Sequence, residues 1–149
     1  MELDDVAETR VTGVRVVGGF AELSTLVPQA WRDLAAAGLP QDVVLVELSS
    51  RRADGDYEEV LGVVDEDGAG DELRAAAGHL ELVTGVFPGG LVVRTEHEGP
   101  VEQIAQTFAE LMDWAAGRAL RPTGELLDSG YRVDGAAERH TLWVRVEQV

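Results

Sequence analysis

The sequence predicts an α+β protein in which the order strand, helix, strand, strand occurs twice. The 149 residues are long enough for one domain with a hydrophobic core. Two helical patterns align with each other, Trp31 with Phe108 and Leu34 with Leu111. We therefore expect a single domain over residues 1–149, built of two pseudo-repeats at about 10–65 and 79–149.

The first unit begins with Val11 to Leu23, which is rich in Val and Gly and is expected to be extended. Ser24 or Thr25 can cap a helix whose apolar residues recur at helical spacing, as far as Gly38-Leu39-Pro40. Two strands follow it, Val43 to Ser50 and Tyr57 to Val64, joined by a polar hairpin turn at 51–56.

The second unit repeats this order. Leu80 to Thr95 is extended, with a turn or bulge signal at Phe87-Pro88-Gly89-Gly90. A helix begins near Pro100, a position where a missing backbone donor is tolerated. The last strands are expected at Leu126 to Val133 and His140 to Val149. Residues 1–9 and the acidic stretch 65–71 are interpreted as loops.

Charge excludes several classes of partner. Twelve Lys and Arg against 28 Asp and Glu give a net charge of −16, which repels phosphate backbones and anionic lipids and attracts cations. Solubility is the plainer explanation of this charge. An acidic start without a signal peptide, no long apolar run and no cysteine lead us to expect a cytoplasmic protein that binds neither membrane nor nucleic acid.

The segment from Val86 to Pro100, with Phe87-Pro88-Gly89-Gly90 before a strand and His97-Glu98-Gly99-Pro100 after it, resembles the GyrI-like domains, also called bacterial transcription-activator effector-binding domains. Further matches follow at Phe108-x-x-Leu111-x-x-Trp114, at Tyr131, and in the first half at Pro28-x-x-Trp31-x-x-Leu34 and Tyr57-x-x-x-Leu61-Gly62-Val63. The resemblance covers about residues 10–149, through the order and spacing of these motifs.

The resemblance implies antiparallel strands around a ligand cleft with two helices packed outside. It also implies binding of bulky, often cationic aromatic compounds, multidrug binding included, by aromatic walls and a central carboxylate. No basic helix-turn-helix is present, so we expect a stand-alone binding domain without direct DNA contact. The family's acid usually precedes the tyrosine by two positions, where this chain has Ser129, while Asp128 would point to the other side of an unbulged strand.

Glu47 is the most informative single residue, because it interrupts the apolar run Val43 to Leu48. Aligning Pro40 with Pro122 places Glu47 opposite Ser129 in the other repeat, where it could replace the missing acid. A buried carboxylate is costly unless it is paired, so a cationic ligand is expected. The alternative is a solvent-side position beside an arginine such as Arg145.

Aromatic residues complete the candidate binding site. Tyr131 and Trp143 have polar neighbours two residues away and are expected on the face opposite the helices, lining a cleft. Phe20 and Phe87 stand beside glycine-rich bends and are expected at its rim, and Trp114 at the edge of the core. Trp31 and Phe108 have core spacing and are interpreted as structural. The predicted ligand-binding set is Glu47, Tyr131, Trp143, Ser129, Phe20, Phe87 and Trp114.

No motif requires an enzyme. His97 has no second histidine ligand nearby, no serine lies in a nucleophile elbow, and no phosphate loop is present, so neither metal nor cofactor is expected. Three functions stay open. The first is sequestration or sensing of a hydrophobic, planar cation. The second is hydrolysis of a reactive ligand in the same cleft with Glu47 or Tyr131 as general acid or base, the resemblance implying a cyclopropane-type natural product. The third is capture of a basic protein partner by the acidic surface.

Overall fold

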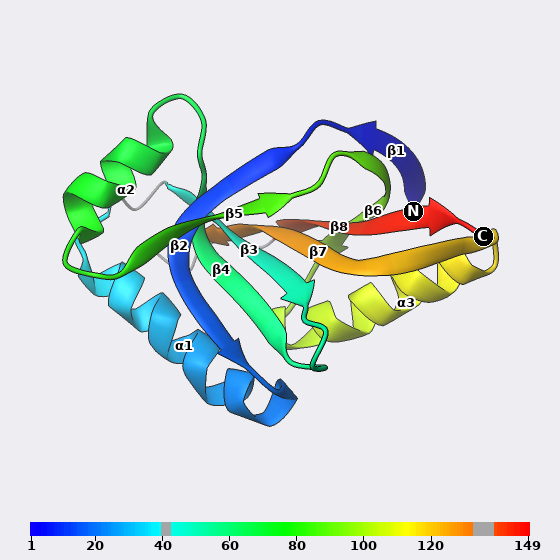
Figure 1. The fold of residues 1–149 in the computed structure, drawn as a ribbon, viewed down its shortest axis with the longest axis horizontal. Helices are drawn as coiled ribbons and strands as arrows, with labels where there is room; N and C mark the ends of the chain where they lie inside the picture. The colour runs from blue at the N-terminus through cyan, green and yellow to red at the C-terminus, as the bar shows by residue number, and fades with distance from the viewer. Residues whose placement is uncertain (40–42, 133–138) are drawn as a thin grey trace.

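The computed structural model describes residues 1–39, 43–132 and 139–149, and within them eight strands form one sheet that three α-helices accompany (Figure 1). The strands are β1 Glu2–Val6, β2 Thr9–Gly18, β3 Val44–Arg51, β4 Tyr57–Val64, β5 Leu82–Phe87, β6 Gly90–Glu98, β7 Leu120–Arg132 and β8 Arg139–Gln148. The helices are α1 Phe20–Ala36, α2 Ala69–Ala77 and α3 Ile104–Ala116, with a 3-10 turn, η1 Val101–Gln103, before α3. The predicted α+β class is confirmed.

All strand pairs are antiparallel, in the order β1-β6-β8-β7-β3-β4-β2-β5. The order reads the same from either end when β1, β2, β3 and β4 are matched to β5, β6, β7 and β8. The first strand of each half pairs with the opposite half, β1 with β6 and β5 with β2. This is the symmetry that two repeats would produce, although the duplication and its boundaries remain a prediction.

One face of the sheet is covered by α1 and α3. The register aligns Leu61, Glu47, Asp128 and Leu142 across four adjacent strands, and aligned residues share a face. Leu61 packs in a core with Leu34 of α1 and Leu73 of α2, whereas Leu142 packs in a second core with Leu111 of α3. Glu47 and Asp128 therefore lie in the middle of the sheet, between the two helix-covered cores.

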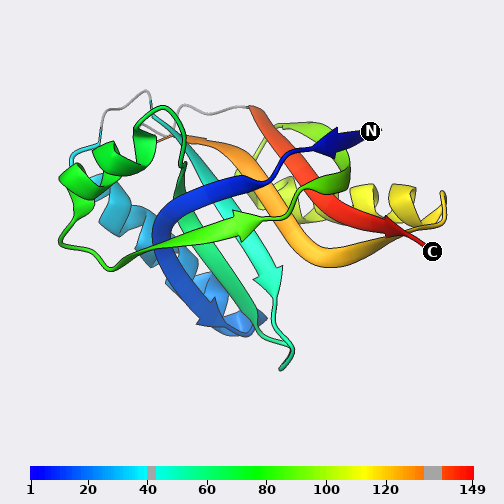
Figure 2. The same ribbon diagram turned by 45° about the horizontal axis from the view of Figure 1, so that its top comes forward.

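The other face has its own hydrophobic core, formed by Val46, Leu48, Val60, Leu127 and Phe87 among others. The sheet is curled, so that β5 lies near β3 and β7 although it pairs with neither (Figure 2). This curvature covers the far face without a helix. No helix among the described residues is long and apolar enough to cross a lipid bilayer.

Three local expectations were wrong. The extended segment ends at Gly18 and α1 begins at Phe20, because the Glu22 side chain accepts a hydrogen bond from the Gly19 N–H at 3.4 Å and closes the first turn ahead of Ser24. Residues 2–6, expected as a loop, pair with β6. The acidic stretch leads directly into α2, whose first turn carries Asp71 and Glu72, where acidic side chains favour a helix.

Candidate functional site

Three carboxylates meet on the helix-covered face at the centre of the sheet. Glu47 of β3 lies opposite Asp128 of β7, and Glu59 of β4 is close enough to Glu47 to hydrogen bond with it. Asp128 is only 4% exposed and Glu59 9%. Ionised carboxylates at such depth repel one another, so the arrangement favours the protonated form of at least one of them.

A bulge in β7 brings Asp128 into this group. Gly130 has φ +142°, a backbone conformation that L side chains rarely adopt, and the pairing with β3 shifts by one residue at this point. Asp128 and Tyr131, three residues apart, consequently share the helix-covered face. Ser129 points to the other face. The expectation for an unbulged strand, with Ser129 beside Tyr131, is corrected by this bulge.

The electrostatics of Glu47 follow from its surroundings. Desolvation by burial raises the pKa of Glu47 well above its ordinary value, and the carboxylates of Glu59 and then Asp128 raise this pKa further. A hydrogen bond with the Tyr131 hydroxyl lowers it in part. Glu47 forms no ion pair with any residue that the structure describes. Arg145, the alternative partner, instead donates to the carbonyl oxygens of Gly89 at 3.1 Å and Leu91 at 3.4 Å.

Asp128 has a partner, the fully buried His140 of β8. The His140 Nδ1 lies 2.7 Å from the Asp128 Oδ1, and its Nε2 is buried with no hydrogen-bond partner among the described residues. One oxygen of Glu59, Oε2, is likewise buried without a partner in the part of the chain that the structure describes. Unpartnered buried polar atoms are uncommon and carry a free-energy cost.

Aromatic rings close the group on the helix side. The ring of Trp31, from α1, stacks on that of Tyr131 with centroids 4.7 Å apart and planes at 29°, and His140 meets Tyr131 edge-on at 4.6 Å. Burial and the nearby charges of Glu47 and Asp128 raise the pKa of Tyr131, so its hydroxyl keeps its proton. The polar neighbours of Tyr131 predict that it lies on the face opposite the helices. This prediction is wrong, because its ring stacks on Trp31 of α1.

We call this set the helix-side cluster: Trp31, Glu47, Glu59, Asp128, Tyr131 and His140. Of its members only Glu47 and Tyr131 were among the predicted ligand-binding residues. The spacing of Trp31 predicts a core residue, and an unbulged strand would direct Asp128 to the other side of the sheet. Glu59 and His140 gave no signal in the sequence, since their proximity results from strand pairing.

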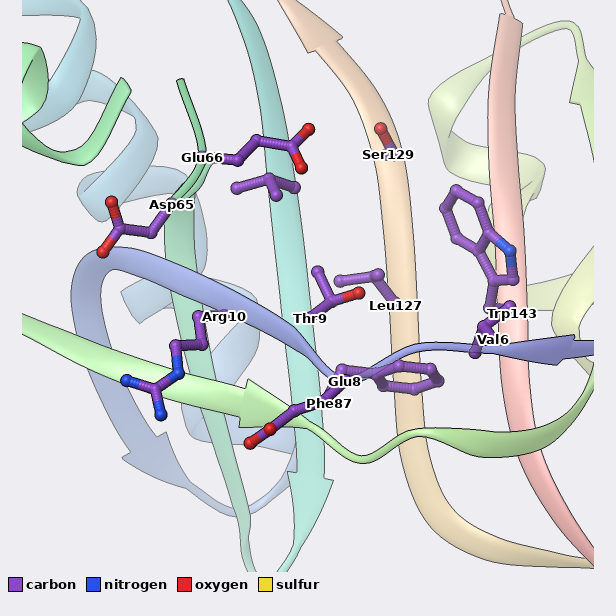
Figure 3. Close-up of a pocket in the computed structure, with 11 residues that line it drawn as sticks. Val6, Glu8, Thr9, Arg10, Asp65, Glu66, Phe87, Leu127, Ser129 and Trp143 are labelled. Carbon is purple, nitrogen blue, oxygen red and sulfur yellow. The ribbon is translucent and has the colours of Figure 1, made fainter. Parts of the chain in front are cut away.

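Three other predicted residues lie together on the far face. Phe87, Ser129 and Trp143 line a cavity of about 400 Å³, the far-face pocket (Figure 3). The predicted site is thus divided by the sheet into two places, and residues 128 and 129, adjacent in sequence, belong to different ones.

The last two predicted residues belong to neither place. Phe20 begins α1 and is 84% exposed. Trp114 packs on the α3 core, with the Arg118 guanidinium 3.7 Å from its ring centroid. His97 is buried and makes contacts to Thr107 at 2.7 Å and the Pro100 carbonyl oxygen at 3.0 Å, which tie β6 to the start of α3.

Solved structures with this fold are similar over almost the whole chain. SAV2435, solved bound to tetraphenylphosphonium, is 12% identical with a TM-score of 0.68, covering 98% of this chain and 93% of that chain. An integron cassette protein of Vibrio cholerae is 14% identical with a TM-score of 0.69, covering 98% and 95%. A hydrolase from Listeria innocua is 16% identical with a TM-score of 0.57, covering 98% and 90%.

At such identities these structures establish the fold alone. No curated protein matches the sequence. The model of the GyrI-like small molecule binding domain matches residues 1–147, nearly the full length of the chain. The resemblance that the motifs indicated is confirmed: the chain belongs to the GyrI-like small molecule binding domain family.

Proposed function

We propose that the protein binds a hydrophobic, planar organic cation at the helix-side cluster. The observation that carries this proposal is Glu47, a carboxylate beside two others with no ion pair among the described residues. A bound cation would favour the ionised form of Glu47 and offset its repulsion by Glu59 and Asp128. It would also contact the Glu59 Oε2, which has no hydrogen-bond partner within residues 1–39, 43–132 and 139–149.

The aromatic rings supply the other half of the recognition. Trp31 and Tyr131 are flat, stacked and adjacent to the carboxylates, and such rings attract cations through their negative faces. The two stacked rings occupy the space next to Glu47. A planar ligand would therefore displace one ring and stack on the other. The tetraphenylphosphonium bound to SAV2435, an aromatic cation, is in keeping with this chemistry.

A thermal-shift titration tests the proposal. Rhodamine- or ethidium-like cations should raise the melting temperature, and anionic dyes of similar shape should not. Glu47→Gln keeps the shape and removes the charge, so cation affinity should fall by about 1–3 kcal/mol. Glu102→Gln, an exposed position on η1, is the matched control and should bind as the parent does. Equal binding of anionic dyes, or an unaltered Glu47→Gln variant, would contradict the proposal.

A second function is favoured by one feature of the same cluster. The raised pKa lets Glu47 hold a proton next to the Tyr131 hydroxyl, which is what a general acid requires. The Listeria innocua hydrolase of similar fold is consistent with this. Turnover of a strained, cyclopropane-type compound, abolished in Glu47→Gln, would support a hydrolase. Binding of the compound without formation of any product would support the cation-binding function and contradict the hydrolase.

A further inference from the structure

The far-face pocket lies where the two halves of the sheet exchange their first strands. It is lined by residues from β1, from the β1–β2 connection, from β2 and β5, from the end of β4, and from the central strands β7 and β8. Its volume of about 400 Å³ falls in the range of small-molecule sites. The sheet separates it from the helix-side cluster, because Ser129 lines the pocket and Asp128 points the opposite way.

The inner surface of this pocket is apolar and aromatic. Phe87 and Leu127 are buried members of the far-face core, and Trp143 is a partly buried residue that packs against them. Trp143 lines the pocket and its indole N–H makes no hydrogen bond with any described residue, so this donor is available to a ligand. A planar molecule can stack on such a ring.

The rim is acidic. Glu8 and Glu66 are exposed and make no ion pair within the described ranges, whereas the Asp65 carboxylate accepts a hydrogen bond from Thr12 at 3.2 Å and lies 3.8 Å from Arg74. Figure 3 shows Glu66 across the pocket from Trp143, with Ser129 above and Thr9 and Leu127 below the space between them in this view. The Arg10 guanidinium, the basic group among the lining residues, points away from this space.

We propose that the far-face pocket is a second ligand site, which takes a small aromatic monocation. The ring of the ligand stacks on Trp143 above Phe87 and Leu127, and its positive charge lies toward Glu66. The charge of the rim selects against an anion of equal shape. This site is independent of the proposed helix-side function, because no residue contributes to both.

The proposal is tested by titrating N-methylquinolinium into the uniformly ¹⁵N-labelled Glu47→Gln variant, in which the helix-side acid is removed. The indole N–H signals of Trp31, Trp114 and Trp143 report three separate places in one spectrum. We expect the Trp143 signal to shift and saturate, while those of Trp31 and Trp114 stay. The same titration with 2-naphthoate, an anion of similar shape, should leave Trp143 unmoved.

Two variants sharpen the assignment. Glu66→Gln removes an exposed charge and should weaken N-methylquinolinium binding about two- to fivefold, in keeping with an exposed ion pair, while Glu102→Gln should leave it unchanged. Trp143→Leu preserves apolar contact and should weaken binding about fivefold through loss of the ring. Because Glu66 is exposed, its variant keeps the test valid even if Trp143→Leu fails to fold.

The proposal is overturned if the Trp143 signal does not move, if 2-naphthoate shifts it equally, or if Glu66→Gln binds like Glu102→Gln. If the helix-side proposal is wrong, a different experiment shows it: the dye titration of the parent protein will detect no binding that depends on Glu47. The two proposals therefore fail on different observations.

Discussion

The two faces of β7 place similar residue types in different physical situations. On the helix side, Asp128 is buried beside Glu47 and His140, and the neighbouring space is filled by Trp31 and Tyr131. On the far side, Ser129 lines a pocket in which two of the acids, Glu8 and Glu66, are exposed to water. A charge withdrawn from water interacts strongly and shifts pKa values, whereas an exposed charge is screened. Substitutions on the helix side should therefore have larger effects than equivalent ones on the far face.

The bulge that separates the two faces should be the most sensitive position. A Cβ on Gly130 would lie 2.5 Å from the Arg139 carbonyl oxygen and 2.9 Å from the His140 Cα, at a φ of +142°. Gly130→Ala should therefore lower the free energy of unfolding by about 3 kcal/mol, measured by urea denaturation. Gly117→Ala is the control, since a Cβ there meets ordinary contacts at 3.6 Å or more and should change stability by less than about 1 kcal/mol. Equal stability of the two variants would show that the bulge is dispensable.

The second-largest effect is expected from removal of an aromatic ring in the helix-side cluster. Tyr131→Ala removes the ring that stacks on Trp31, and cation affinity in a dye titration should fall by about 1–2 kcal/mol. Trp114→Leu is the comparison, because Trp114 packs in the α3 core and should leave dye affinity within about twofold. If Tyr131→Ala binds the dye as tightly as the parent, the ligand does not occupy the helix-side cluster.

The pH dependence of stability should distinguish the two faces. The raised pKa of Glu47 means that folding takes up a proton, so its contribution is fully present below the unfolded value of about 4.3 and is lost as pH rises through the folded value. Glu47→Gln should match the parent near pH 4 and exceed it by about 1 kcal/mol at pH 8, in urea melts at both pH values. Glu66→Gln, at an exposed position on the rim of the far-face pocket, is the comparison and should change stability by less than about 0.5 kcal/mol. A constant difference for Glu47→Gln would exclude a raised pKa.

The smallest effect concerns the coupling within the helix-side cluster. The Glu59 charge raises the pKa of Glu47, so in Glu59→Gln the loss of stability with rising pH should be complete at a lower pH than in the parent. The shift is toward lower pH because one of the two neighbouring negative charges has been removed. No shift, or one to higher pH, would show that Glu47 titrates independently of Glu59.

Much of the fold could be predicted from the sequence. The helical spacing of Trp31 and Leu34, the hairpin at 51–56 and the turn at 87–90 each depend on local chemistry, and each lies where expected. The missed elements depend on partners distant in the chain. Residues 2–6 become a strand because β6 offers an open edge, and α1 begins early because Glu22 hydrogen bonds to Gly19.

The candidate site divides along the same line. Sequence by itself identified Glu47, since a carboxylate within an apolar strand is conspicuous, and identified the family through its ordered motifs. Only the tertiary structure decided which residues share a face with it. One glycine in a left-handed conformation reverses the side-chain direction along β7, so that Asp128 replaces Ser129 beside Tyr131. Strand alternation has a period of two, and a single inserted residue is enough to exchange the two faces of a sheet.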